Sequence, residues 1–221
     1  MIEKITEQYS LKDISKRYSR VLLDASVLRK HPFAVCLGSD DLARKLDVLD
    51  AQRNSAGLLR RYILELENLY ITEMVLKDFW APRARKTRLS LIESSGEEEF
   101  LNLARKLKEV SEAKKDLFAT LSDPKRIIEL NTMQECDYKI YHDANAELID
   151  PNKLRDVDYD LLIKGFVLGR KVGRETTAIL SNHFGMGKSW SSLRRRYYLS
   201  PSQFGFFKRN DLDRYSSFEQ M

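Results

Sequence analysis

Residues 21–24 read Val-Leu-Leu-Asp, and this stretch decides how the rest of the chain is interpreted. Three consecutive apolar residues after a basic segment predict a short buried β-strand, and Asp24 stands where that strand ends. A carboxylate next to buried apolar residues is costly without a partner. Asp24 is therefore either a cap at the strand end or part of a polar site at the edge of a sheet.

Further segments of the chain predict strands that alternate with helices. Residues 69–72 and 176–181 are apolar and β-branched, and a basic loop over residues 194–201 leads into a last short strand. Apolar residues at helical spacing predict helices over residues 39–49, 54–67, 73–80, 97–121 and 126–148, and from Asp156 onward. This alternation predicts an α/β protein of three layers, α/β/α, with a central, mostly parallel sheet.

The composition is that of a soluble globular protein. Of the 221 residues, 43% are hydrophobic, and 38 Lys and Arg against 33 Asp and Glu leave a net charge of only +5, which does not by itself identify a nucleic-acid partner. We expect one domain over residues 1–221, with a helical insert over residues 83–150 whose amphipathic helices pack together as a hairpin. Two cysteines are too few for a disulfide framework. No stretch resembles a leader or a membrane span, so we expect a cytoplasmic protein without a membrane partner.

Acids stand near the carboxyl ends of the predicted strands, where parallel sheets bind their ligands. Asp78 lies on the helix after the second strand, and Asp158 and Asp160 open the helix before the third. Converging carboxylates repel one another unless a cation lies between them, and Mg²⁺ or Mn²⁺ prefers such oxygen ligands. Two alternatives stay open: Glu73 competes with Asp78 for the same place, and Asp158, like Asp156, suits the first turn of a helix.

The order of these motifs resembles that of the PIN-domain ribonucleases. The matching segments are Val21–Leu28, Leu69–Phe79, Asp160–Ile163, Ala178–Asn182 and Tyr197–Phe204, within residues 18–80 and 154–207. The resemblance implies a Mg²⁺- or Mn²⁺-dependent endoribonuclease that hydrolyses RNA phosphodiester bonds. Its catalytic, metal-holding acids are then Asp24, Asp78 and Asp160, with Asp158 as a further metal ligand. The residues expected to support this site are Ser26, Ser181, Asn182 and His183.

Two departures from the family pattern favour a second function. His183 stands where family members commonly carry a fourth acid, and imidazole is a poor ligand for Mg²⁺. The helical insert over residues 83–150 is not needed by the compact family core. The alternative is therefore a catalytically degenerate PIN-like module that binds RNA, or a protein partner through the insert, without cutting. A flap-type DNA nuclease usually collects more acids than are visible here, and homo-oligomerisation stays open.

Basic residues interleaved with aromatic ones predict contacts to RNA phosphates and bases. These residues are Arg83, Arg85, Lys86, Arg88, Arg194, Arg195, Arg196 and Lys208. Runs of charge are also typical of solvated surface, which is the other interpretation. Residues 185–189 superficially resemble a phosphate-binding loop but lack its first glycine, so they predict a flexible loop near the site.

Overall fold

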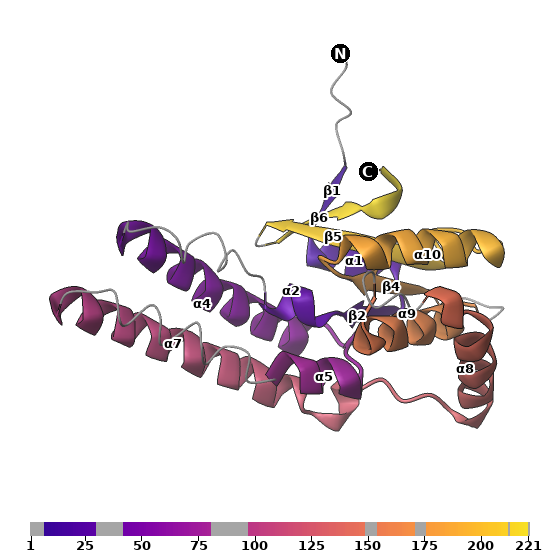
Figure 1. The fold of residues 1–221 in the computed structure, drawn as a ribbon, viewed down its shortest axis with the longest axis horizontal. Coiled ribbons are helices and arrows are strands. Elements are labelled where there is room, and N and C mark those ends of the chain that lie inside the picture. Colours follow the sequence, from indigo (N-terminus) through magenta and orange to yellow (C-terminus); the bar gives the residue numbers. More distant parts are fainter. Residues whose placement is uncertain are drawn as a thin grey trace, which may run out of the picture.

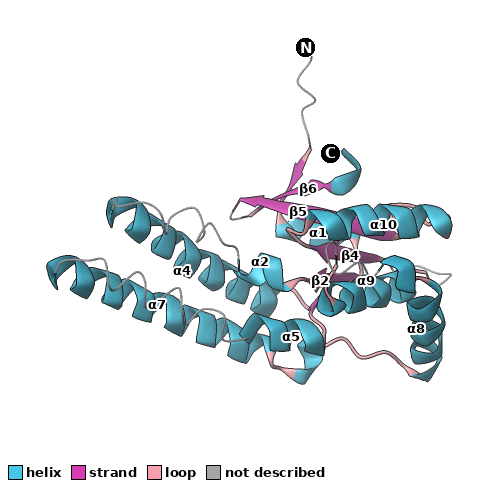
Figure 2. Cartoon of the chain, viewed as in Figure 1, coloured by secondary structure: helices cyan, strands magenta, loops and turns pink. Residues whose placement is uncertain are grey.

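The computed structural model describes residues 7–29, 42–80, 97–148, 154–170, 176–211 and 213–220. Helices surround one central β-sheet, and a pair of long helices projects from it (Figures 1 and 2). None of the helices in these ranges combines the length and the apolar character that a membrane span requires.

Within the described residues the sheet has six strands in the order β1-β6-β5-β4-β2-β3. The strands are β1 (Gln8–Tyr9), β2 (Arg20–Leu23), β3 (Leu69–Tyr70), β4 (Thr177–Leu180), β5 (Phe204–Asp211) and β6 (Arg214–Ser217). β2 pairs in parallel with β3 and β4, and β4 with β5, whereas β6 is antiparallel to β5 and to β1. The sheet is mixed, so the prediction of a mostly parallel sheet is wrong. The link between β5 and β6 is long enough for a hairpin but too short for the crossover that parallel strands need.

Helices in the described ranges follow most of the predicted patterns. They are α1 (Leu11–Arg17), α2 (Ala25–Arg29), α4 (Leu42–Glu65), α5 (Glu73–Trp80), α7 (Glu97–Leu121), α8 (Thr132–Ala144), α9 (Asp156–Gly169) and α10 (Phe184–Arg196). The predicted helices over 73–80 and 97–121 are confirmed. Those over 39–49 and 54–67 are one helix, α4, because the apolar stripe continues through Leu49, Ala56, Leu59 and Ile63, all buried. The stretch over 126–148 contains the shorter α8, with short 3₁₀ helices at Pro124–Arg126 and Ala146–Leu148.

Helix α10 corrects two predictions for the C-terminal part of the chain. Residues 185–189 and 194–196 are helical rather than loops, and the last parallel strand begins only at Phe204. Met186, Trp190 and Leu193 recur at helical spacing on α10 and are all buried. Burial of this face outweighs the low helix propensity of the glycines on the same segment.

Helices cover both faces of the sheet, as β5 shows most clearly. Side chains alternate between the two faces along a strand. Phe206 faces the side of α10, where its ring centroid lies 5.8 Å from that of Trp190. Phe207 faces the opposite side, where its ring meets Tyr18, the residue after α1. Gly205 also lies on that side, and a Cβ there would lie 2.4 Å from the Tyr18 hydroxyl oxygen, so only glycine fits.

The long helices α4 and α7 lie side by side and form an arm that projects from the sheet (Figure 1). The arm has a small core of its own, made by Leu49, Leu103 and Val110. Helix α8 packs against α9 instead. Among the described residues of the predicted insert, which leave out 83–96 and 149–150, helices α7 and α8 each pack against a helix outside it, so the predicted hairpin is wrong. The apolar stripe of α7 is matched by that of α4.

Candidate functional site

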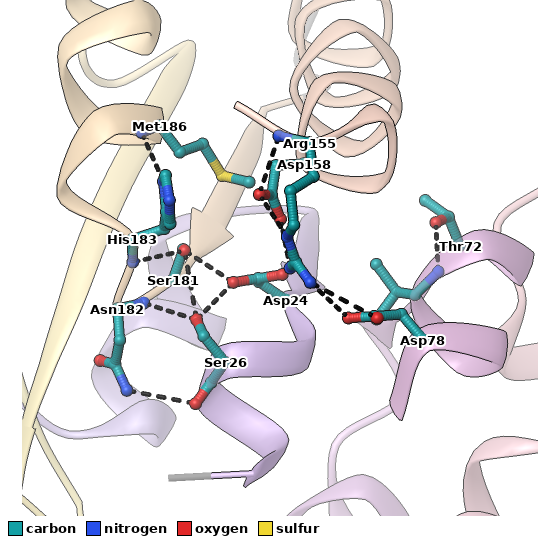
Figure 3. Close-up of polar contacts among 11 residues, drawn as sticks. Asp24, Ser26, Thr72, Asp78, Arg155, Asp158, Ser181, Asn182, His183 and Met186 are labelled. Atoms are coloured by element: carbon teal, nitrogen blue, oxygen red, sulfur yellow. Dashed lines mark hydrogen bonds and ion pairs between the residues drawn. The ribbon is translucent and has the colours of Figure 1, made fainter. Parts of the chain in front are cut away.

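The candidate site lies where the parallel strands β2 and β4 end side by side. Leu23 and Leu180 are paired in register, so the residues that follow them, Asp24 and Ser181, lie at the same edge of the sheet. The Ser181 hydroxyl donates a hydrogen bond to Oδ2 of Asp24 at 2.8 Å, and the Ser26 hydroxyl donates to the same oxygen (Figure 3). Two hydroxyl groups from two segments therefore hold one carboxylate oxygen in place.

The other carboxylate oxygen of Asp24, Oδ1, has no hydrogen-bond donor among the described residues, although it is buried. The whole residue is inaccessible to solvent. Burial raises the pKa of Asp24, and the negative charge of Asp158 raises it further, against the opposing hydrogen bonds of Ser26 and Ser181. A buried acceptor without a donor is expensive, so this oxygen is a place where a cation is favoured.

Arg155 lies among the acids and joins two of them (Figure 3). Its Nε and Nη2 donate to the two carboxylate oxygens of Asp158 at 3.0 and 2.9 Å, and its Nη1 donates to Asp78 at 3.2 Å. The side chain of Asp158 is fully buried and that of Asp78 is 15% exposed, whereas that of Arg155 is 39% exposed. The paired acids raise the pKa of Arg155. We call Asp24, Asp78, Arg155 and Asp158 the acid–arginine cluster.

Two helices carry these groups: Arg155 and Asp158 stand at the start of α9, and Asp78 lies near the end of α5. Arg155 is the residue before α9, and Asp158, three residues later, accepts a hydrogen bond from its backbone N–H at 3.3 Å. A carboxylate at this position satisfies a free N–H of the helix terminus. Thr72 caps α5, since its Oγ1 accepts from the backbone N–H of Val75 at 3.2 Å, and Asp78 follows on that helix. The Thr72 hydroxyl thus satisfies a free N–H group at the start of α5.

Asp160 is placed elsewhere, although it lies on α9 only two residues after Asp158. Its carboxylate accepts from the Tyr138 hydroxyl at 2.9 Å and pairs with Lys164 at 3.0 Å. Its charge contributes, after burial, to raising the pKa of Tyr138. Residues two apart on an α-helix point about 200° away from each other. The structure therefore brings Asp24, Asp78 and Asp158 together, and Asp160 contacts α8 instead.

The supporting residues expected from the sequence surround Asp24. The backbone N–H of Asn182 donates to the Ser26 hydroxyl at 2.8 Å, and that of His183 donates to the Ser181 hydroxyl at 3.0 Å. His183 also caps α10, because its Nδ1 accepts from the backbone N–H of Met186 at 3.1 Å. One ring nitrogen of His183 is thus used by the helix, and these residues hold the two serines that hold Asp24.

The other acids and the basic residues are found as follows. Glu73, the rival of Asp78, is exposed and pairs with Lys77 at 2.7 Å. Arg194 pairs with Glu219 at 2.5 Å, and Arg196 pairs with Glu147. Of the remaining basic residues named above, Arg195 is exposed on α10, Lys208 is partly buried on β5, and Arg83, Arg85, Lys86 and Arg88 lie outside the described residues.

Arg155 is the member of the cluster that sequence reasoning missed. The signal for it was present, because Arg155 and Asp158 stand at positions i and i+3 at the start of a predicted helix, where opposite charges meet. Nothing local indicated that the same guanidinium also reaches Asp78, 77 residues away along the chain. That contact depends on how α5 and α9 pack together.

Comparison of the chain with protein-family models, with curated proteins and with solved structures found no match. In the part of the chain that the structure describes, no three His, Cys, Asp or Glu side chains are arranged to hold a metal ion. The guanidinium of Arg155 lies between the carboxylates that would otherwise face one another (Figure 3). In the acid–arginine cluster, the positive charge among the carboxylates is thus supplied by the side chain of Arg155.

The raised pKa of Asp24 predicts a pH-dependent stability difference for Asp24→Asn. Its carboxyl loses its proton at higher pH in the folded than in the unfolded chain, whose ordinary value is 3.8. Stability is therefore lost as pH rises through the folded pKa. In metal-free buffer we expect Asp24→Asn to be more stable than wild type at pH 7, with the difference vanishing below about pH 4. Urea denaturation between pH 3.5 and pH 7.5 measures this. A difference that does not change with pH contradicts it.

Proposed function

We propose that this chain is a PIN-like, Mg²⁺- or Mn²⁺-dependent endoribonuclease that hydrolyses RNA phosphodiester bonds. The observation that carries the proposal is the buried Oδ1 of Asp24, which lacks a donor among the described residues, at an edge where Asp78 and Asp158 converge. Carboxylates from three separate segments of the chain meet there. Such a set suits a hard divalent cation, which prefers carboxylate oxygens as ligands.

The residues that would hold the ion are Asp24, Asp78 and Asp158. Bound there, a divalent cation would supply a Lewis acid that activates water and stabilises the phosphate oxygens. Ser26 and Ser181 fix the orientation of Asp24 through its Oδ2 and leave its Oδ1 for the ion. Asp160 stays the sequence-based candidate, although its pairing with Lys164 and Tyr138 gives it another role.

Exposed groups at the start of α10 support an RNA substrate. Phe184 follows His183 directly and is 55% exposed, and the amine of Lys188 lies 4.8 Å from the centre of its ring. An exposed ring beside a cation offers both base stacking and a phosphate contact, which is the combination that single-stranded nucleic acid requires. Arg195 is also exposed on this helix, whereas the ion pairs of Arg194 and Arg196 occupy those side chains.

A second function, a degenerate PIN-like module that binds RNA or a protein without cutting, is favoured by one observation. The guanidinium of Arg155 already neutralises part of the acidic cluster. If that pairing is permanent, no divalent ion enters. The arm formed by α4 and α7 then offers a surface for a protein partner.

The test is cleavage of a fluorescently labelled single-stranded RNA by the full chain in Mn²⁺, in Mg²⁺ and in EDTA. We expect cleavage that depends on the metal ion. Asp24→Asn and Asp158→Asn are expected to slow it about 100-fold or more, because each removes a ligand that positions the cation. Asp160→Asn is the matched control for Asp158→Asn, since it makes the same chemical change two residues further along α9. It is expected to cleave RNA at nearly the wild-type rate.

Two results contradict parts of this proposal. RNA that stays intact in both metals while fluorescence anisotropy still reports binding supports the non-cutting module instead. If Asp160→Asn loses cleavage and Asp158→Asn does not, the third metal ligand is Asp160 and not Asp158. Each variant is compared with wild type by circular dichroism, so that loss of fold is separated from loss of activity.

A further inference from the structure

We infer that Arg155 is a built-in cation that competes with the divalent metal ion for Asp158 and Asp78, so that Arg155 sets the metal affinity of the site. This inference rests on the proposed function, because it concerns the same carboxylates. It adds Arg155 to that site, and it means that the chain itself keeps the affinity of the site for metal ions low. The ion binds only as the guanidinium moves away.

The hydrogen bonds of Arg155 occupy the oxygens that a metal ion needs. Both oxygens of Asp158 are taken by Nε and Nη2, and both oxygens of Asp78 lie within 3.4 Å of Nη1. Each N–H of the guanidinium uses a lone pair that a metal ion would otherwise bind, and the positive charges of the two cations repel each other. The guanidinium therefore weakens the binding of a metal ion to the same carboxylates.

The surroundings of Arg155 allow the side chain to leave. Its side chain is 39% exposed, whereas the side chain of Asp158 is fully buried. The long flexible stem of an arginine reaches solvent by rotation alone. Asp158 keeps its place meanwhile, because its Oδ2 also accepts from the backbone N–H of Arg155 at 3.3 Å. The carboxylate is thus held by the helix start, and only the counter-charge moves.

Charge and geometry both leave a role for the ion. Three carboxylates, when ionised, face one guanidinium, so the cluster keeps a negative charge that attracts a divalent cation. The Oδ1 of Asp24 has no donor among the described residues, and the Arg155 guanidinium makes no hydrogen bond to it.

The test is the affinity for Mn²⁺ alone, measured by isothermal titration calorimetry on the full chain. Arg155→Met removes the competing charge. We expect this variant to bind Mn²⁺ with an affinity at least about 10-fold higher than that of wild type. Arg155→Lys keeps one charge but cannot reach both acids, so an intermediate affinity is expected. Asp24→Asn in the Arg155→Met background is expected to abolish the gain.

A matched control comes from the arm. Arg53 on α4 also contacts two acids, Glu109 at 2.7 Å and Asp50 at 3.6 Å, and its side chain is 42% exposed. Arg53→Met is expected to leave Mn²⁺ affinity unchanged, although it removes the same charge. An equal gain in Arg53→Met shows that net charge alone is responsible, and it overturns the inference.

The remaining outcomes separate the inference from the proposed function. If wild type and Arg155→Met bind Mn²⁺ with equal affinity, and Asp24→Asn abolishes binding in both backgrounds, the competition is overturned but the proposed metal site stands. No Mn²⁺ binding by either protein removes the proposed metal site and the competition together. If Arg155→Met folds only when Mn²⁺ is added, the ion replaces the guanidinium, which supports the inference. Weaker binding to Arg155→Met overturns it.

Discussion

Arg155→Met is expected to lower the free energy of unfolding by about 3 kcal/mol in metal-free buffer, the lower end for a broken buried ion pair. The lower end applies because the arginine side chain is 39% exposed, although its partner Asp158 is fully buried. Without the guanidinium, Asp158 keeps a buried charge that the backbone N–H of residue 155 alone cannot offset. Urea denaturation followed by circular dichroism in EDTA measures this loss.

The double variant Arg155→Met with Asp158→Asn tests whether the pair is responsible. Removing the buried charge together with its partner is expected to restore much of the lost stability. Arg53→Met, which breaks partly exposed ion pairs on the arm, is expected to cost no more than about 1 kcal/mol. If the losses from the two single variants simply add, Arg155 and Asp158 are not coupled and the cluster is misassigned.

Trp190→Ala is expected to lower the free energy of unfolding by about 3–5 kcal/mol, as is usual for a large aromatic residue removed from a core. Trp190 lies on α10, is 1% exposed, and packs against Phe206 and Phe218. Its indole N–H also donates to the backbone carbonyl of Phe204 at 3.1 Å. The variant leaves a cavity and a carbonyl without its donor. Thermal and urea unfolding measure the effect.

The second tryptophan provides the control. Trp80, at the end of α5, is 49% exposed and contacts the ring of Phe118. Trp80→Ala is expected to cost much less stability, because half of the side chain already faces water. Fluorescence checks the burial of Trp190 independently. The Trp80→Ala variant keeps only Trp190 and is expected to emit at shorter wavelength than the Trp190→Ala variant, which keeps only Trp80. Equal losses in the two variants contradict the placement of α10 against the sheet.

The position of the site was predictable from local sequence patterns. The apolar residues of β2 are buried on both faces, and Asp24 follows them directly, so its place at the carboxyl edge follows from the pattern. The helix after β3 and its cap at Thr72 were predictable for the same reason, because periodicity and capping are short-range properties.

The path of the chain after β4 was not predictable in this way. Residues 185–189 contain two glycines and read as a loop, yet they begin α10. A Cβ at position 187 would lie 2.4 Å from the ring of Phe218, so glycine is needed there for close packing and not for flexibility. A short-range pattern does not distinguish these two uses of glycine, because the ring that approaches is 31 residues away.

The sequence alone determined the parallel strands β2, β3 and β4 and the candidate acids, since strand burial, helix periodicity and caps depend on neighbouring residues. Only the tertiary structure decided which acids meet. Asp158 and Asp160 both lie near the start of α9, but the orientation of the helix directs one to Arg155 and the other to Tyr138. The tertiary structure also decided that Asp78 pairs with Arg155. Electrostatic pairing depends on distance in space, and the packing of α5 on α9 sets that distance.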